Sequence, residues 1–203
     1  MAAKSTNRAG QATRNAILDQ AARFFSTHGY RATSLADLLG ALTLTKGAFY
    51  HHFKSKQALA LELVKRAGSE YQAQLYQPAL SLTTPRERIS ALLHLVAELN
   101  DRPDWCNCQL LLALAREVES TDTTLRAALD QLASQAFATW QSLLQAAQAA
   151  GDVSEKWPPD LLARFILNTI WGALHARKAD FQPVDLKGFT EILEGFLFIK
   201  AEQ

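Results

Sequence analysis

Apolar residues recur at helical spacing along almost the whole chain, and this periodicity constrains the fold more than any other feature. Ala and Leu dominate, β-branched runs are short, and no segment alternates apolar with polar residues for long enough to predict a strand. With 203 residues, 48% of them hydrophobic, the chain is long and apolar enough to bury a core. The sequence therefore predicts an all-α protein of about nine helices.

Capping and breaking residues place the boundaries of these helices. In the first 55 residues, Gly29 closes one helix, Thr33-Ser34 and Thr45 cap the next two, and the three are expected at about 13–28, 35–41 and 46–53. Longer helices are expected at about 55–77, 85–101, 106–119, 122–149, 159–179 and 185–201. The pattern predicts an N-terminal three-helix domain, residues 1–54, and a larger helical domain, residues 55–203.

The small net charge of +1 hides a strong asymmetry along the chain. Residues 1–67 hold ten Lys and Arg against three Asp and Glu, whereas residues 68–203 hold eleven against seventeen. A basic N-terminal region followed by an acidic remainder favours a polyanionic partner for the first region only. Random segregation of surface charge would give the same totals.

Three further features limit the compartment and the class of protein. No stretch reaches the roughly 20 uninterrupted apolar residues of a membrane helix. The first ten residues are polar and lack the apolar middle of a secretory signal. Cys106 and Cys108 are too few for a disulfide framework. We therefore expect a soluble, cytoplasmic protein with no membrane partner.

Two short helices joined by a tight turn, in a basic region and braced by a preceding helix, match a helix-turn-helix reader of DNA at about residues 34–53. The second helix of such a motif must be short, and its outward side chains must be donors or small groups that allow close approach to the bases. Residues 45–53 fit, because Phe49 and Phe53 share the inner face and polar or small residues occupy the others. A three-helix unit that binds no DNA is the alternative.

The runs Thr33-Ser34-Leu35-Ala36-Asp37-Leu38-Leu39 and Thr45-Lys46-Gly47-Ala48-Phe49-Tyr50-His51-His52-Phe53-Lys54-Ser55-Lys56 resemble the N-terminal signature of the TetR family of bacterial repressors. The resemblance covers about residues 13–64, and the later helices are similar only in number, length and punctuation. It implies that the DNA contacts are made by Thr33, Ser34, Thr45, Lys46, Gly47, Ala48, Tyr50, His51, His52 and Lys56.

One position departs from the family's pattern. Thr43 stands in the turn where the family usually has Gly. A β-branched residue in a left-handed conformation is strained. Either the turn has a different shape here, or it tolerates a strain of about 1 kcal/mol.

A regulator of this type is expected to act as a homodimer on a palindromic double-stranded operator, because one helix-turn-helix reads only a few base pairs. The last two predicted helices are apolar on more than one face, which indicates burial on more than one side. In the resembled family these helices form the interface between two subunits. The alternative is that both are core helices of a monomer.

The resemblance also implies a cavity for an unknown small-molecule effector in the larger domain. Aromatic residues with a few polar groups are the candidates for its lining: Trp105, Phe137, Trp140, Phe165, Asn168, Trp171 and His175. Each of these residues can equally be an ordinary core or surface residue.

Cys106 and Cys108 are the one unusual chemical feature of the larger domain. They are either structural thiols, a redox-sensitive pair at a helix N-terminus, or half of a metal site.

No phosphate-binding loop, nucleophile elbow or metal-ligand run is present, so we expect no enzyme, no catalytic residue, no metal and no cofactor. The sequence predicts a ligand-responsive homodimeric DNA-binding regulator, most simply a repressor released by a small molecule or by thiol modification. A DNA-binding regulator without an effector, constitutive or architectural, is the alternative.

Overall fold

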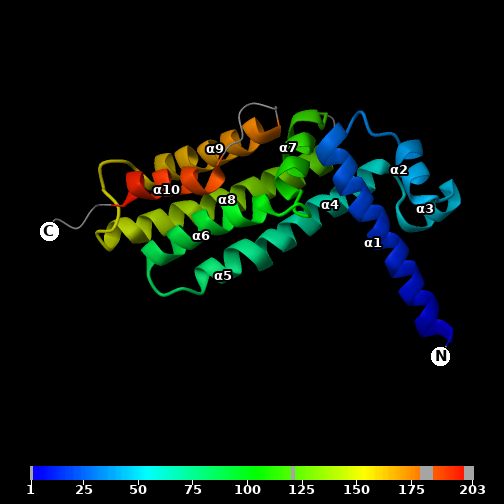
Figure 1. Ribbon diagram of the computed structural model, residues 1–203, viewed down its shortest axis with the longest axis horizontal. Helices are drawn as coiled ribbons and strands as arrows, with labels where there is room; N and C mark the ends of the chain where they lie inside the picture. The colour runs from blue at the N-terminus through cyan, green and yellow to red at the C-terminus, as the bar shows by residue number, and fades with distance from the viewer. Residues whose placement is uncertain (1, 120–121, 179–184, 199–203) are drawn as a thin grey trace. The chain divides into compact units, whose positions relative to one another are not determined.

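The computed structural model describes residues 2–119, 122–178 and 185–198, and within these residues the all-α prediction is confirmed (Figure 1). Nine helical segments are present there when the continuous helix over residues 56–80 is counted once. The chain divides into two compact units, which we call the head unit (residues 1–67 and 106–129) and the body unit (residues 68–105 and 130–203). The head unit thus contains a segment that is far from the N-terminus in sequence. The predicted domains, residues 1–54 and 55–203, are each continuous in sequence, whereas each compact unit is made of two segments. The division into these two domains remains a prediction.

Helix α1, Ala2–His28, is longer than predicted. Its apolar stripe begins near Ile17, which is buried with Ala21 and Phe25. The preceding turns contain Ala, Lys, Arg and Gln, residues that favour helix without forming an apolar stripe, so periodicity alone does not detect them. Gly29 ends the helix in a left-handed conformation with φ +97°, as expected.

Helices α2, Leu35–Leu42, and α3, Lys46–His52, form the predicted short pair. The Ser34 side chain accepts a hydrogen bond from the Asp37 N–H and Asp37 reaches back to the Ser34 N–H, which completes a capping box. The pKa of Asp37 is lowered, chiefly because its carboxylate accepts these hydrogen bonds from Ser34. Thr43 does adopt the left-handed conformation, with φ 54° and ψ 40°, so the turn has the strained geometry.

The next helix runs without a break through α4, Lys56–Tyr71, the π-helical turn η1, Gln72–Tyr76, and α5, Gln77–Leu80. The predicted end at residue 77 is therefore wrong by three residues. Pro78 lies inside this continuous run, at the start of α5 and directly after the π-helical turn.

Helix α7, Asn107–Glu117, and the first two turns of α8, Thr123–Ala149, belong to the head unit, in which α7 packs along α1. Asp122 caps α8 by accepting a hydrogen bond from the Leu125 N–H at 3.0 Å. It also accepts one at 2.8 Å from the Gln57 side chain on α4. Two helices remote in sequence from residues 1–54 are thereby part of the same compact unit.

The body unit contains α6, Pro85–Asp101, α9, Pro159–Lys178, and α10, Leu186–Leu197, together with the rest of α8. Helix α6 agrees with its prediction, and α10 packs against it. Helix α10 ends before the predicted residue 201, because Phe198 is extended and forms an isolated bridge with Val153. Residues 199–201, and the predicted end of α9 at residue 179, lie outside the described residues.

Candidate functional site

Helix α3 presents a polar outer face and an apolar inner face. Phe49 is fully buried and Phe53 nearly so, whereas Tyr50 is 54% exposed. Thr45, Lys46, Gly47 and His51 are also exposed, while Ala48 and His52 are half-buried. The Thr45 side chain caps the helix by accepting a hydrogen bond from the Ala48 N–H at 3.2 Å. The first turn of α3 therefore points small and hydrogen-bonding groups into solvent.

The two hydroxyls before α2 are already engaged within the head unit. Thr33 is buried, and its hydroxyl donates to the Gly29 carbonyl at 2.7 Å. Ser34 is exposed, but its hydroxyl donates to Asp37 Oδ2 at 2.6 Å. Because the Thr33 hydroxyl already donates within the head unit, the Thr33 backbone N–H is its candidate group for a phosphate contact. The N-terminus of α2 remains a candidate phosphate site.

Lys56, the first residue of α4, lies half-buried against aromatic rings. Its Nζ is 4.4 Å from the centroid of the Tyr30 ring and 5.8 Å from that of Phe25. Desolvation lowers the pKa of Lys56, opposed by the charges of Glu117 and Asp37. The ammonium is therefore positioned by a cation–π contact.

The imidazole rings of His51 and His52 pack edge to face. Their ring centroids are 5.0 Å apart with an interplanar angle of 77°. The pKa of His52 is lowered, first by burial and then by the nearby positive charges of His51 and Arg14. Among the described residues no group of three or more His, Cys, Asp or Glu side chains gathers as a metal site.

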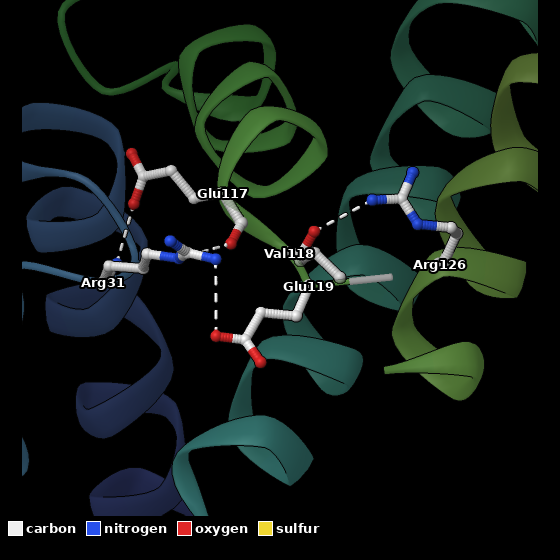
Figure 2. Close-up of polar contacts among 5 residues, drawn as sticks. All are labelled: Arg31, Glu117, Val118, Glu119 and Arg126. Carbon is white, nitrogen blue, oxygen red and sulfur yellow. Dashed lines mark hydrogen bonds and ion pairs between the residues drawn. The ribbon is translucent and has the colours of Figure 1, made fainter. Parts of the chain in front are cut away.

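A set of polar contacts fastens the end of α7 to the loop between α1 and α2 (Figure 2). The Arg31 backbone N–H donates to Glu117 Oε2 at 2.7 Å, and Arg31 Nε donates to the Glu117 carbonyl at 2.9 Å. Arg31 Nη2 also lies 3.4 Å from Glu119 Oε1. Arg126 on α8 donates to the Val118 carbonyl at 2.9 Å. We call this set the α7 clamp.

Gly29 makes room for the α7 clamp. A Cβ atom at this position would lie 2.6 Å from Glu117 Oε1, and the φ of +97° also disfavours a side chain. Sequence reasoning missed the clamp, because Arg31 and Glu117 are 86 residues apart and neither belongs to a local motif. The sequence signal for the clamp is the acidic pair Glu117 and Glu119 at the end of an apolar helix, and such pairs are common at helix ends.

The body unit separates the predicted effector residues into two groups. Trp105 and Trp140 are buried, and Phe137 and Trp171 are half-buried. Phe165, Asn168 and His175 are exposed on the surface of the single chain. The structure therefore does not bring all seven residues together into one interior site. Their role as an effector lining stays a prediction.

Helices α9 and α10 lie side by side and share an exposed apolar face, which we call the α9–α10 face (Figure 1). The rings of Phe165 and Phe196 are 5.6 Å apart on it. Ile192 is 72% exposed and Phe196 58%, and Leu161 is also exposed. Such residues mark an interaction surface when they are contiguous.

The two cysteines differ in their surroundings. Cys106 is half-buried at the N-cap of α7, and Cys108 is buried in its first turn. Within the described ranges, no helix is both long and apolar enough to cross a membrane.

Comparison with known proteins identifies relatives of both parts of the chain. The N-terminal profile of bacterial regulatory proteins of the tetR family matches residues 17–63, and the profile of tetracyclin repressor-like C-terminal domains matches residues 85–193. The HTH-type transcriptional repressor DhaR of Mycobacterium sp. (strain GP1) is 24% identical over 185 residues, which cover 91% of this chain and 92% of DhaR.

Two solved structures share the fold. A TetR transcriptional regulator from Chloroflexus aurantiacus superposes with a TM-score of 0.79 at 26% identity, covering 95% of this chain and 99% of the other. AibR in complex with isovaleryl coenzyme A and operator DNA superposes with a TM-score of 0.77 at 22% identity, covering 92% of this chain and 98% of the other. All three of these proteins are named as regulators or crystallised with operator DNA.

Proposed function

Because the chain belongs to the TetR family of bacterial transcriptional regulators, we propose that it represses transcription by inserting α3 into the major groove of an operator. The protein is a DNA-binding regulator and not an enzyme, and TetR regulators bind operators as dimers and respond to small molecules. The outward face of α3 supports the docking proposal most directly. Lys46, Tyr50 and His51 are exposed on this face, and Phe49 on the opposite face is buried, in the basic part of the chain.

The contacts we propose fall into two classes. Thr45, Lys46, Gly47 and Ala48 lie at the start of α3, where side chains of a docked helix reach base edges. Tyr50, His51, His52 and Lys56, with the N-terminus of α2 at Thr33 and Ser34, are the candidates for phosphate contacts. Neutral His52 donates one N–H, so it would contribute less to phosphate binding than Lys56.

We propose that the α9–α10 face joins two copies of the chain. Leu161, Phe165, Ile192 and Phe196 are large apolar side chains that a monomer leaves in water. Pairing them buries this surface in an isologous interface, and the second copy supplies the second half-site reader.

The α7 clamp offers a route by which a change in the larger domain reaches the DNA-reading helices. Helix α7 begins at residue 107, two residues after the first segment of the body unit ends, and it ends at Glu117, whose carboxylate holds Arg31. A shift of α7 is therefore transmitted to the loop that precedes α2. AibR, which shares the fold, was crystallised in complex with isovaleryl coenzyme A and operator DNA.

A thiol response is a second candidate input. Cys106 lies half-buried at the N-cap of α7, where the helix dipole favours a thiolate, whereas burial makes Cys108 less reactive. Maleimide treatment followed by mass spectrometry should give an adduct at Cys106 and weaken operator binding. Unchanged binding with no adduct at either cysteine removes this input. Reduced thiols accord with the cytoplasmic location that we propose.

The central test is a gel-shift titration with duplexes covering the promoter region of the protein's own gene at low ionic strength. We expect a saturable shift, a palindromic footprint, and a steep loss of affinity with added salt. A protein that is folded and dimeric but shifts none of these duplexes would contradict the proposal. The alternative, a regulator without an effector, is tested by mass spectrometry of the native protein and by a ligand thermal-shift screen. Such a regulator would show no co-purified molecule in the first experiment and no stabilising ligand in the second.

A further inference from the structure

Trp105 holds a hydrogen-bond donor inside the body unit for which the described part of the chain offers no acceptor. The side chain is 7% exposed, and its Nε1 is buried with no acceptor within hydrogen-bond distance among the described residues. The backbone N–H of the same residue does donate, to the Arg102 carbonyl at 3.1 Å. Buried polar groups are nearly always paired, so an unpaired one calls for a specific explanation.

The surroundings of Trp105 combine an aromatic wall with an irregular helix. Its ring packs edge-on against Tyr71, with centroids 5.5 Å apart and an interplanar angle of 83°. Tyr71 immediately precedes the π-helical turn η1, which packs against α6. Arg102 spans the same region by donating to Gln74 of η1 at 3.0 Å. Single π-turns inside α-helices are frequent at functional sites.

The chemistry of the indole limits what can bind it. An indole N–H only donates, so the bound atom must be an acceptor. An isolated carboxylate buried against the rings of Trp105 and Tyr71 would be costly to desolvate, whereas a carbonyl oxygen is not charged. The Arg102 guanidinium is exposed and already paired with Asp104. We propose that Trp105 Nε1–H donates to the carbonyl oxygen of a small, neutral, largely apolar effector, such as a ketone, aldehyde, ester or thioester. This inference rests on the proposed function and specifies the effector's class.

The position of Trp105 in the chain gives the contact a regulatory meaning. It is the last residue before Cys106, at which the head unit resumes, and α7 follows at once. A ligand that reorients Trp105 acts on the start of the helix whose far end carries the α7 clamp. Effector occupancy and operator binding are then linked reciprocally.

The test follows the four indole N–H signals of the ¹⁵N-tryptophan-labelled full-length protein by NMR. The Trp105→Phe variant, which removes the N–H and keeps an aromatic ring, assigns the Trp105 signal. Acetophenone, benzoate and ethylbenzene serve as probes with a neutral acceptor, a charged acceptor and no acceptor. We expect acetophenone to move the Trp105 signal downfield in a saturable manner, and the exposed Trp157 signal to stay in place.

Trp105→Phe should bind acetophenone about 2- to 10-fold more weakly while its affinity for ethylbenzene is unchanged. A Trp105 signal that none of the probes moves, or that is already downfield and unaffected because only a buried water binds it, overturns the proposal. Tighter binding of benzoate than of acetophenone overturns the neutral class. Operator binding is measured in the same samples: wild-type protein that fails to bind DNA counts against the proposed function, whereas intact DNA binding with an indifferent Trp105 counts against this inference alone.

Discussion

Two exposed surfaces of this protein contain aromatic residues in opposite settings. On α3, Tyr50 is 54% exposed beside Lys46 and His51, and its hydroxyl is available to a polar partner. On the α9–α10 face, Phe196 is 58% exposed beside other apolar side chains. A polyanion suits the first surface and a second apolar surface suits the other. The side chains next to an exposed aromatic ring, more than its exposed fraction, therefore indicate which class of partner it binds.

The largest expected effect concerns the apolar surface. Phe196→Glu places a charge at the centre of the α9–α10 face, where pairing would have to desolvate it. We expect the dimer dissociation constant to rise by at least about 100-fold, measured by sedimentation and light scattering. Leu82→Glu, an exposed apolar position outside this face, is the matched control. A Phe196→Glu protein that remains fully dimeric contradicts the assignment of this face.

The DNA-facing surface is tested by a change of size without charge. Ala48→Leu adds bulk to the first turn of α3 and should reduce operator affinity by about 10- to 100-fold by blocking entry into the groove, while the salt slope stays the same. Ala127→Leu, exposed on α8 of the head unit, should have no effect. Equal affinities of the Ala48→Leu variant and the wild-type protein would show that α3 does not enter the groove.

The proposed phosphate contact of Lys56 is expected to have a smaller effect. Lys56→Ala should weaken binding to every duplex alike and flatten the slope of log K against log salt by about one. The measurement is a salt titration on operator and non-operator duplexes, with Lys65→Ala on the same helix as the control. If affinity and slope are both intact, the docking that we propose is wrong.

The smallest effect is expected in the turn that orients α3. Thr43→Gly relieves a left-handed conformation at a β-branched residue and should stabilise the protein by up to about 1 kcal/mol in urea unfolding, part of the gain being offset by the flexibility of Gly. Thr43→Ala keeps a Cβ at the same φ and should gain less. A destabilised Thr43→Gly protein would show that the threonine contributes a contact outweighing its strain.

The short helices of the head could be predicted because their signals are local. Ser34 with Asp37, and Thr45 with the Ala48 N–H, are capping arrangements three residues apart, and Phe49 with Phe53 is a helical spacing on one face. The left-handed turn at Thr43 was one of two alternatives, and the structure selects the strained one.

The remainder depends on contacts that no local pattern encodes. The early start of α1 lacks an apolar stripe, and the end of α10 is set by the bridge between Phe198 and Val153. Phe165 was a candidate for an interior site because aromatic character does not distinguish a cavity from an interface; it lies exposed beside Phe196. The pairing of Arg31 with Glu117 depends on how α7 returns to α1.

The α7 clamp determines whether the N-terminal DNA-binding helices can be transferred to another protein. An N-terminal fragment ending at residue 67 would lack Glu117, and the Arg31 N–H and guanidinium would lose their acceptors. It would also expose the side of α1 on which α7 packs. A chimaeric regulator that is to keep this operator specificity therefore has to include residues 107–126 as well as the N-terminal helices. Without them, α2 and α3 would lack the contacts that α7 makes with the N-terminal segment.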